Sequence, residues 1–173
     1  MIQKKSLVSP FDPVVGSIRR TRNMPHIQNS GSTYACNSNT TPGKILSDPE
    51  KTTVFNAIVF LHEKHYDLFG VVVMPDHFHL VINPIMDAAG ASVSLPRIFH
   101  SIKSFTSMKL SKVNGVAWQD EHFDRIVRSE EEFYKQLRYL ENNPLEAGLV
   151  SHPQEYKWLW HVGISESPKP LAD

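Results

Sequence analysis

Residues 71–82 read VVVMPDHFHLVI, and this stretch decides how the rest of the chain is interpreted. It sets two histidines, His77 and His79, two positions apart in an otherwise apolar, β-branched segment. Alternate residues of a strand point to the same side of a sheet, so both imidazoles should face one way. Imidazole is the commonest metal ligand in proteins, and this pair would supply two ligands of a three-ligand open site. The alternative is that one or both histidines are structural residues at the end of a sheet.

The segments around this stretch predict a β-hairpin preceded by a strand and a helix. Residues 66–74 and 77–83 are typical of two strands joined by a tight Pro-Asp turn. Upstream, Asp48 is the expected N-cap of a helix, because a proline and a set of apolar residues at helical spacing follow it. Residues 31–41, which lie between glycine and Pro-Gly signals, are a candidate first strand.

The downstream segments complete an α+β pattern. Residues 94–113 predict a second helix, and residues 118–128 predict one more strand. The last helix has the clearest signals: Ser129 and Glu132 form a capping box, and the helix should run to Asn143, where a proline stops it. The order β-α-β-β-α-β-α predicts a ferredoxin-like two-layer sandwich with an antiparallel sheet and an added C-terminal helix.

Length and composition predict one cytosolic domain with extensions. A chain of 173 residues can bury a sizeable core, and a single cysteine, Cys36, excludes an internal disulfide and a Cys-rich zinc site. No secretory leader is recognisable, and the longest apolar run, residues 69–74, is too short to cross a bilayer. We expect a basic, partly disordered arm over residues 1–27, a folded domain over residues 28–161 and a tail over residues 162–173.

The 18 basic and 18 acidic residues balance overall but are distributed unevenly. Two segments are basic, residues 1–30 with one aspartate and residues 95–113 with no acid. Such patches can bind phosphates, although a charge run is more often only a solvated face. The basic residues of the two segments are Lys4, Lys5, Arg19, Arg20, Arg22, Arg97, Lys103, Lys109 and Lys112.

The last predicted helix carries a second candidate group. Tyr139 and Asn143 are four residues apart, so they should lie on one face of the helix, one turn from each other. If that face meets the two histidines, the Asn143 oxygen completes a three-ligand metal site and Tyr139 stands beside the cation as a nucleophile. Free tyrosine has a pKa near ~10 and needs such a neighbour to react at neutral pH. The alternative is that Tyr139 is a core aromatic residue and Asn143 a helix cap.

Five spaced motifs together resemble one known family. They read MPDHFHLV at residues 74–81, IKS at 102–104, VAWQ at 116–119, FDRIVR at 123–128 and YLENNPLEAGLV at 139–150. In this order they closely resemble the REP-associated tyrosine transposases, which are single-tyrosine members of the HUH endonuclease superfamily. The resemblance covers residues 24–160, whereas a His-x-His pair alone would not be specific.

The resemblance implies roles for individual residues. The metal histidines of the family fall on His77 and His79, its amide-bearing third ligand on Asn143, and its catalytic nucleophile on Tyr139. The implied activity is cleavage and rejoining of single-stranded DNA beside a palindromic hairpin, through a 5′-phosphotyrosine and with Mg²⁺ or Mn²⁺. The implied setting is the bacterial cytoplasm, at the nucleoid, as a monomer or homodimer. We expect DNA contacts from Arg19, Arg20, Arg22, Lys103, Lys109 and Lys112, and from the N-terminal element that contains Gly31, Ser32 and Thr33.

One segment departs from the family pattern. Residues 34–41 are rich in asparagine, serine and threonine, whereas the first strand of the family is aromatic and β-branched. Asn and Ser are poor strand formers, so we expect a short or irregular strand, or a copy with reduced activity. Two other functions therefore stay open: a hairpin-binding protein that has lost cleavage, and a small hydrolase in which the histidines activate water and Tyr139 is structural.

Overall fold

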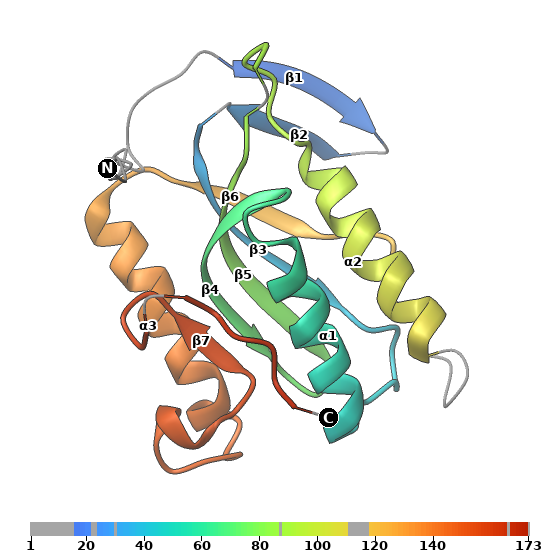
Figure 1. Ribbon diagram of the computed structural model, residues 1–173, viewed down its shortest axis with the longest axis vertical. Coiled ribbons are helices and arrows are strands. Elements are labelled where there is room, and N and C mark those ends of the chain that lie inside the picture. Colours follow the sequence, from blue (N-terminus) through green and yellow to red (C-terminus); the bar gives the residue numbers. More distant parts are fainter. Residues whose placement is uncertain are drawn as a thin grey trace, which may run out of the picture.

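The computed structural model describes residues 16–21, 24–29, 31–86, 88–110, 118–165 and 167–172. Helices and strands alternate along most of this chain (Figure 1). In chain order they are β1 (Gly16–Thr21), β2 (Met24–Asn29), β3 (Thr33–Asn39), α1 (Asp48–Leu61), β4 (Tyr66–Val73), β5 (His77–Pro84), α2 (Leu95–Leu110), β6 (Phe123–Val127), α3 (Glu130–Glu146), the 3₁₀ turn η1 (Pro153–Glu155) and β7 (Leu159–His161).

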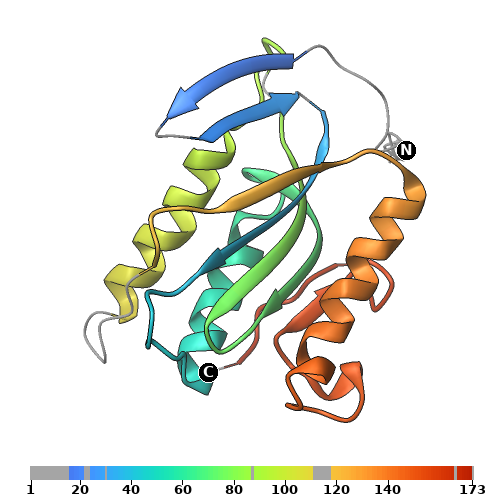
Figure 2. The same ribbon diagram turned by 180° about the vertical axis from the view of Figure 1, so that it is seen from behind.

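Five strands form an antiparallel sheet in the order β6-β3-β5-β4-β7. Figure 2 shows the side of this sheet on which α3 packs, and β5 is the central strand of the five. Strands β6, β3, β5 and β4 lie in the order expected for a ferredoxin-like sheet. The α+β prediction is therefore confirmed. The edge strand β7 was not predicted, because three residues are too few to show a period of two.

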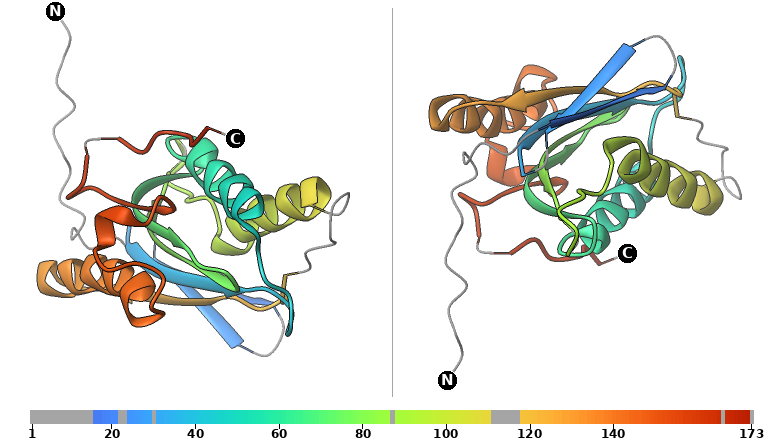
Figure 3. Two further views of the ribbon diagram at one scale, coloured as in Figure 1. Left: turned by 90° about the horizontal axis from the view of Figure 1, so that it is seen from below. Right: turned by 90° about the horizontal axis from the view of Figure 1, so that it is seen from above.

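The helices lie on both faces of the sheet (Figure 3). Helices α1 and α2 cover one face, and α3 packs on the other against β4, β5 and β7. The face under α1 and α2 holds the main apolar core, where Phe78, Leu80 and Ile82 of β5 are fully or almost fully buried. Alternate residues of β5 point the other way, so His77 and His79 face the side that α3 covers.

Gly70 of β4 lets α3 approach the sheet closely. A Cβ atom at Gly70 would lie 2.5 Å from Leu140 Cδ1 and 3.1 Å from Leu137 Cδ2, both of α3. Such distances are below ordinary van der Waals contact, so a side chain at Gly70 would have to displace the leucine side chains of α3 that pack there. The strand is irregular between Leu68 and Gly70, which is typical of a glycine where another element packs closely.

The end of α3 differs from the prediction. The helix continues through Pro144 to Glu146, although Pro144 has no N–H and so cannot bond the Leu140 carbonyl. The helix ends instead at Gly148, whose φ of 66° belongs to the left-handed region. Gly148 N–H donates to the Leu145 carbonyl and Leu149 N–H to the Pro144 carbonyl, as in a Schellman motif. The glycine, and not the proline, therefore stops the helix.

Three further boundaries differ. The N-cap of α1 is Ser47 and not Asp48, and Ser47 N–H and Oγ–H both donate to the Glu50 carboxylate. Strand β6 is shorter than predicted, because Trp118 makes only an isolated bridge with Thr40. Within the predicted arm, β1 and β2 pair as an antiparallel ladder, an element that the sequence pattern did not predict. Residues 1–15 of that arm lie outside the described residues.

The predicted tail is tied to the domain. Asn56 of α1 donates to the Leu171 carbonyl at 2.9 Å and accepts from Leu171 N–H at 2.7 Å. Among the described residues, no helix has the length and apolar character needed to cross a membrane. The division at residues 27 and 161 stays a prediction.

Candidate active site

The two histidines of β5 lie side by side under α3. Their ring centroids are 4.8 Å apart, and the rings are nearly perpendicular. Both side chains are partly exposed, unlike Phe78 between them, which is fully buried. Both imidazoles therefore lie on the same side of the sheet, as the spacing of the two histidines predicted.

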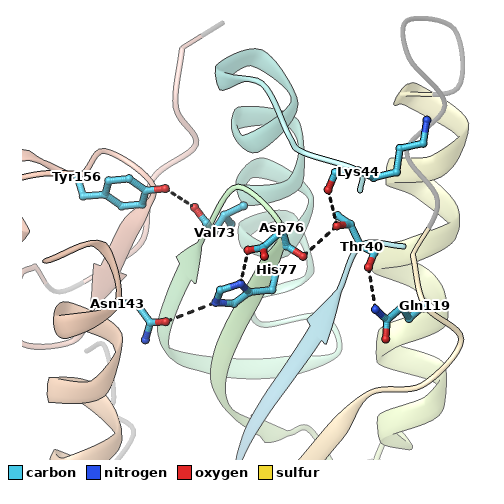
Figure 4. Close-up of polar contacts among 8 residues, drawn as sticks. All are labelled: Thr40, Lys44, Val73, Asp76, His77, Gln119, Asn143 and Tyr156. Carbon is cyan, nitrogen blue, oxygen red and sulfur yellow. Dashed lines mark hydrogen bonds and ion pairs between the residues drawn. The ribbon is translucent and has the colours of Figure 1, made fainter. Parts of the chain in front are cut away.

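His77 lies between a carboxylate and an amide (Figure 4). Its Nδ1 is 2.6 Å from Asp76 Oδ1, and its Nε2 is 3.4 Å from Asn143 Oδ1. An ionised carboxylate only accepts hydrogen bonds, so Asp76 favours a tautomer of His77 with the proton on Nδ1 and leaves Nε2 toward Asn143. Asn143 Nδ2 donates to the Tyr139 carbonyl at 2.6 Å, which fixes Oδ1 as the atom that faces His77.

His77 Nε2 and Asn143 Oδ1 face each other across 3.4 Å. With a proton on Nε2 the imidazole would donate to the amide oxygen, whereas an unprotonated Nε2 and the amide oxygen could together bind a cation. An amide oxygen and imidazole nitrogens are suitable donors for Mn²⁺, and the carboxylate behind His77 resembles the partners that orient metal-binding histidines. In the part of the chain that the structure describes, no three His, Cys, Asp or Glu side chains gather around one point. A metal site here would thus depend on the Asn143 amide.

The turn that carries Asp76 is held by hydrogen bonds from residues distant in the sequence (Figure 4). Thr40 at the end of β3 donates to the Asp76 carbonyl through its N–H and its hydroxyl, and Gln119 in turn donates to the Thr40 carbonyl. The Tyr156 hydroxyl donates to the Val73 carbonyl at the end of β4. These bonds fix the turn, so Asp76 can hold His77 in one orientation.

The surroundings of His79 favour its neutral form. Burial, with a smaller effect of neighbouring His77, lowers the pKa of His79 to about 4. Its imidazole is therefore neutral at neutral pH, which is the form that binds a metal. The ring packs edge-to-face on Tyr139, with the centroids 5.1 Å apart.

Tyr139 is not a core residue. Its side chain is 46% exposed, and it lies beside a surface hollow of about 470 Å³ between α3 and strands β3, β5 and β6. Helix α3 thus brings Tyr139 and Asn143 to the two histidines, and the four predicted residues gather at one place. Their catalytic and metal-binding roles stay predictions.

The polar strand β3 is regular and central, so the prediction of a short or irregular strand was wrong. It pairs with β5 on one side and β6 on the other. Its buried apolar residues, Tyr34 and Cys36, face the core, whereas Asn37 lies directly opposite His79 and Asn39 opposite His77. The asparagines at alternate positions belong to the same face as the histidines. That period of two in the polar residues was the signal that the sequence analysis missed.

The predicted DNA-contact residues are scattered. Lys103 Nζ donates to the carbonyls of Gln119, Asp120 and Glu121, and burial lowers its pKa to about 8, although Asp120 opposes this shift. Thr33 is buried, and Gly31 has a positive φ of 78° in the turn before β3, where Ser32 follows it. Lys109 is exposed near the end of α2. Arg19 and Arg20 belong to β1, and Arg22 and Lys112 lie outside the described residues. No geometry here tests their binding to DNA.

Comparison with known structures identifies the architecture. A REP-associated tyrosine transposase bound to a REP hairpin superposes with a TM-score of 0.64, with 16% sequence identity over 82% of this chain and 81% of that chain. The fold is that of a REP-associated tyrosine transposase. A candidate transposase from Deinococcus radiodurans R1 also matches, with a TM-score of 0.46, 18% identity and coverage of 64% of this chain and 88% of that chain. No model of a known protein family and no curated protein matches the sequence.

Proposed function

We propose that the protein is a transposase-like, metal-dependent endonuclease and strand transferase that acts on single-stranded DNA at palindromic, REP-type hairpins. One observation carries the proposal: Tyr139 packs on His79 while the Asn143 oxygen and His77 Nε2 face each other beside it. The residues proposed as nucleophile and as cation ligands therefore lie close together, which supports the proposal. The structural neighbour is bound to a REP hairpin, and this supports the choice of substrate.

The residues that would hold the cation are His77, His79 and Asn143. Two imidazoles and one neutral amide oxygen favour Mn²⁺ over Mg²⁺, although either ion fits an oxygen-rich phosphate complex. The chemistry that such a cation supplies is polarisation of a phosphoryl oxygen. Asp76 would keep His77 in the tautomer whose Nε2 is free to bind.

The proposed reaction is an exchange of one phosphodiester for another. Tyr139 Oη forms a bond to phosphorus while the bond from phosphorus to the 3′ oxygen breaks. The phenolic proton passes to water, and the departing 3′ oxygen takes a proton from water. The products are a 5′-phosphotyrosine and a free 3′-hydroxyl, and the reverse reaction with another 3′-hydroxyl rejoins the strands. No ATP is needed, because the tyrosyl ester preserves the phosphodiester bond energy.

The test is a search for DNA covalently linked to the protein. Wild type is incubated with Mn²⁺ and a labelled library of single-stranded hairpins with random flanks, and Tyr139→Phe serves as the matched variant. We expect an adduct with wild type, and its complete loss with unchanged hairpin binding in Tyr139→Phe, because only the attacking oxygen is removed. The exposed Tyr134, one residue from buried Phe133 on α3, provides the control Tyr134→Phe, which should keep the adduct.

Three results would overturn the proposal. An undiminished adduct in Tyr139→Phe would place the nucleophile elsewhere. Nicked DNA with no adduct would indicate a hydrolase that uses water. Hairpin binding without any nicking would indicate a DNA-binding protein. The cytoplasmic location at the nucleoid and a monomeric or dimeric state stay predictions.

A further inference from the structure

The hollow beside Tyr139 contains residues that the proposed cleavage reaction does not use. A row of cross-strand neighbours crosses the sheet beneath it, from Phe123 of β6 through Asn37 of β3 to His79 of β5. Directly opposite residues of antiparallel strands point to the same face, so Phe123 and Asn37 extend the site away from the histidines. Lys135 and Gln136 of α3 line the same hollow from above.

Phe123 is unusual for a phenylalanine on a strand. Its side chain is 49% exposed at the wall of the hollow, whereas core aromatics such as Phe78 are fully buried. An exposed ring next to a polar site offers a face on which a flat ligand can stack. Nucleobases stack on such rings, whatever the base, because every base has a π-face.

Asn37 has unused hydrogen-bonding groups. Its side chain is only partly exposed, and among the described residues the carboxamide has no hydrogen-bond partner. A carboxamide presents a donor and an acceptor side by side, the combination that can pair with the edge of a base. It lies between Phe123 and His79, so a base stacked on Phe123 would bring its edge toward Asn37.

The charge around the hollow also suits a nucleotide. Arg125 is engaged by Glu132 of α3 at 2.5 Å, so much of its charge is compensated. Lys135 is exposed and forms no ion pair within the described ranges, and it lies one helical turn before Tyr139 on the same face of α3. A phosphate next to the one attacked by Tyr139 could therefore approach Lys135.

We propose that this hollow is a nucleotide subsite, in which Phe123 stacks on the base of a nucleotide that flanks the scissile phosphate and Asn37 hydrogen-bonds to the edge of that base. Lys135 contacts the neighbouring phosphate. The volume of about 470 Å³ falls within the range of small-ligand sites, roughly 300–1,000 Å³. The inference rests on the proposed function and adds to it the residues that select the cleavage position.

The test couples a change in the protein to a change in the DNA. Abasic sites are placed singly at each nucleotide around the cleavage position, and hairpin binding and adduct formation are measured with wild type and Phe123→Ala. In wild type, removing the stacked base should weaken binding about 5- to 150-fold, which corresponds to one stacking contact. In Phe123→Ala that penalty should vanish at one of the two flanking nucleotides and persist elsewhere.

Matched variants separate stacking from packing. Phe123→Trp keeps an aromatic face and should keep the penalty, whereas Phe123→Leu keeps the apolar volume and should lose it. Phe60→Ala removes a more exposed ring, 66% exposed on α1 at the opposite face of the sheet, and should behave as wild type. Asn37→Ala should flatten the preference among the four bases at the coupled nucleotide, while Asn39→Ala should retain that preference whatever its rate.

The outcomes distinguish this inference from the proposed function. Suppose that wild type forms the adduct, but each abasic site weakens binding by the same factor in wild type and in Phe123→Ala. The subsite is then wrong and the proposed function stands. If Phe123→Leu behaves as wild type, the ring only packs and the subsite is equally wrong. If coupling appears in binding while no adduct forms, the subsite stands and the cleavage activity is wrong. If wild type neither binds nor cleaves any hairpin, both are overturned.

Discussion

The two faces of the central sheet differ although the same strands supply both. Under α1 and α2, alternate residues of β3 and β5 such as Tyr34, Phe78 and Leu80 are buried in the apolar core. Under α3, the residues in between include four that are partly exposed and polar, with His77 and His79 opposite Asn39 and Asn37. Substitutions at two neighbouring residues of one strand therefore test different properties: one tests the stability of the core, and the other tests the proposed site.

This difference also corrects how a polar strand is interpreted. Asn and Ser lower the apolar burial of β3, yet its neighbours on both sides satisfy its backbone and its alternate residues still reach the core. Tertiary context thus overrides weak strand propensity. The asparagines lie on the same face as the histidines and do not interrupt the strand, whereas the activity of this copy stays a prediction.

The sharpest test of the core face is Phe78→Ala. Phe78 is fully buried, stacks on Phe99 and packs edge-to-face on Trp118. We expect the free energy of unfolding to fall by about 3–5 kcal/mol, the usual cost of removing a buried ring. Urea denaturation measures this, with exposed Phe60→Ala as the control that should change it by less than about 0.5 kcal/mol. Equal losses in both variants would mean that the core does not lie under α1 and α2.

On the other face, His77→Ala and His79→Ala should leave the fold intact and remove function. Loss of one of three protein ligands should lower adduct formation at limiting Mn²⁺ at least about 100-fold, since even the partners behind metal ligands contribute 10- to 100-fold. Circular dichroism verifies that the variants fold, and a gel assay of the covalent adduct measures activity. Wild-type rates in either variant would show that the two histidines are not needed for activity. The metal site would then be wrong, and the face under α3 would not be the functional face.

The lowered pKa of His79 predicts that the free energy of unfolding falls in acid. The unfolded imidazole has a pKa near ~6.5, whereas burial lowers that of the folded one to about 4. Between these values the unfolded state binds more protons, so stability falls as the pH falls from about 6.5 to about 4. With metal chelated by EDTA, wild type should lose about 2–3 kcal/mol more than His79→Gln over this range. Parallel stability curves for the two proteins would show that His79 is not protected from protonation.

The smallest expected effect concerns Asp76, which lies behind His77. Asp76→Ala removes the carboxylate that accepts from Nδ1–H, so the imidazole can adopt the other tautomer or rotate. Apparent Mn²⁺ affinity in the adduct assay should drop about 10-fold, and saturating metal should restore the rate. Asp76→Asn should be milder, since its amide oxygen can still accept the hydrogen bond. A defect that added metal cannot correct would assign Asp76 to the turn alone.

The sequence was sufficient for the parts that local rules control. The hairpin of β4 and β5 follows from β-branched runs on both sides of a Pro-Asp turn, and α3 begins at the predicted Ser129, whose side chain accepts from Glu132 N–H at 3.1 Å. Spacing alone put His77 with His79 on one face and Tyr139 with Asn143 on another. That the two faces meet depends on the sheet order, which the resemblance implied and the structure shows.

The remaining features depend on contacts between distant residues. Strand β7 has a place only because β4 offers a free edge, and the ladder of β1 and β2 depends on cross-strand pairing and not on a visible period. The bond of Asp76 to His77 follows from how Thr40 fixes the turn, 36 residues away in sequence. No local pattern encodes such relations.

Gly70 has a consequence for the proposed reaction although it carries no reactive group. The hydrogen atom in place of a side chain lets Leu140 rest against β4, and Leu140 is the residue next to Tyr139. An attacking oxygen must come within about 3–3.5 Å of its target, and a misplacement of 1 Å can cost about 100-fold in rate. In the proposed reaction, the close packing of Leu140 on Gly70 would therefore help to hold Tyr139 at a fixed distance from the residues of the sheet.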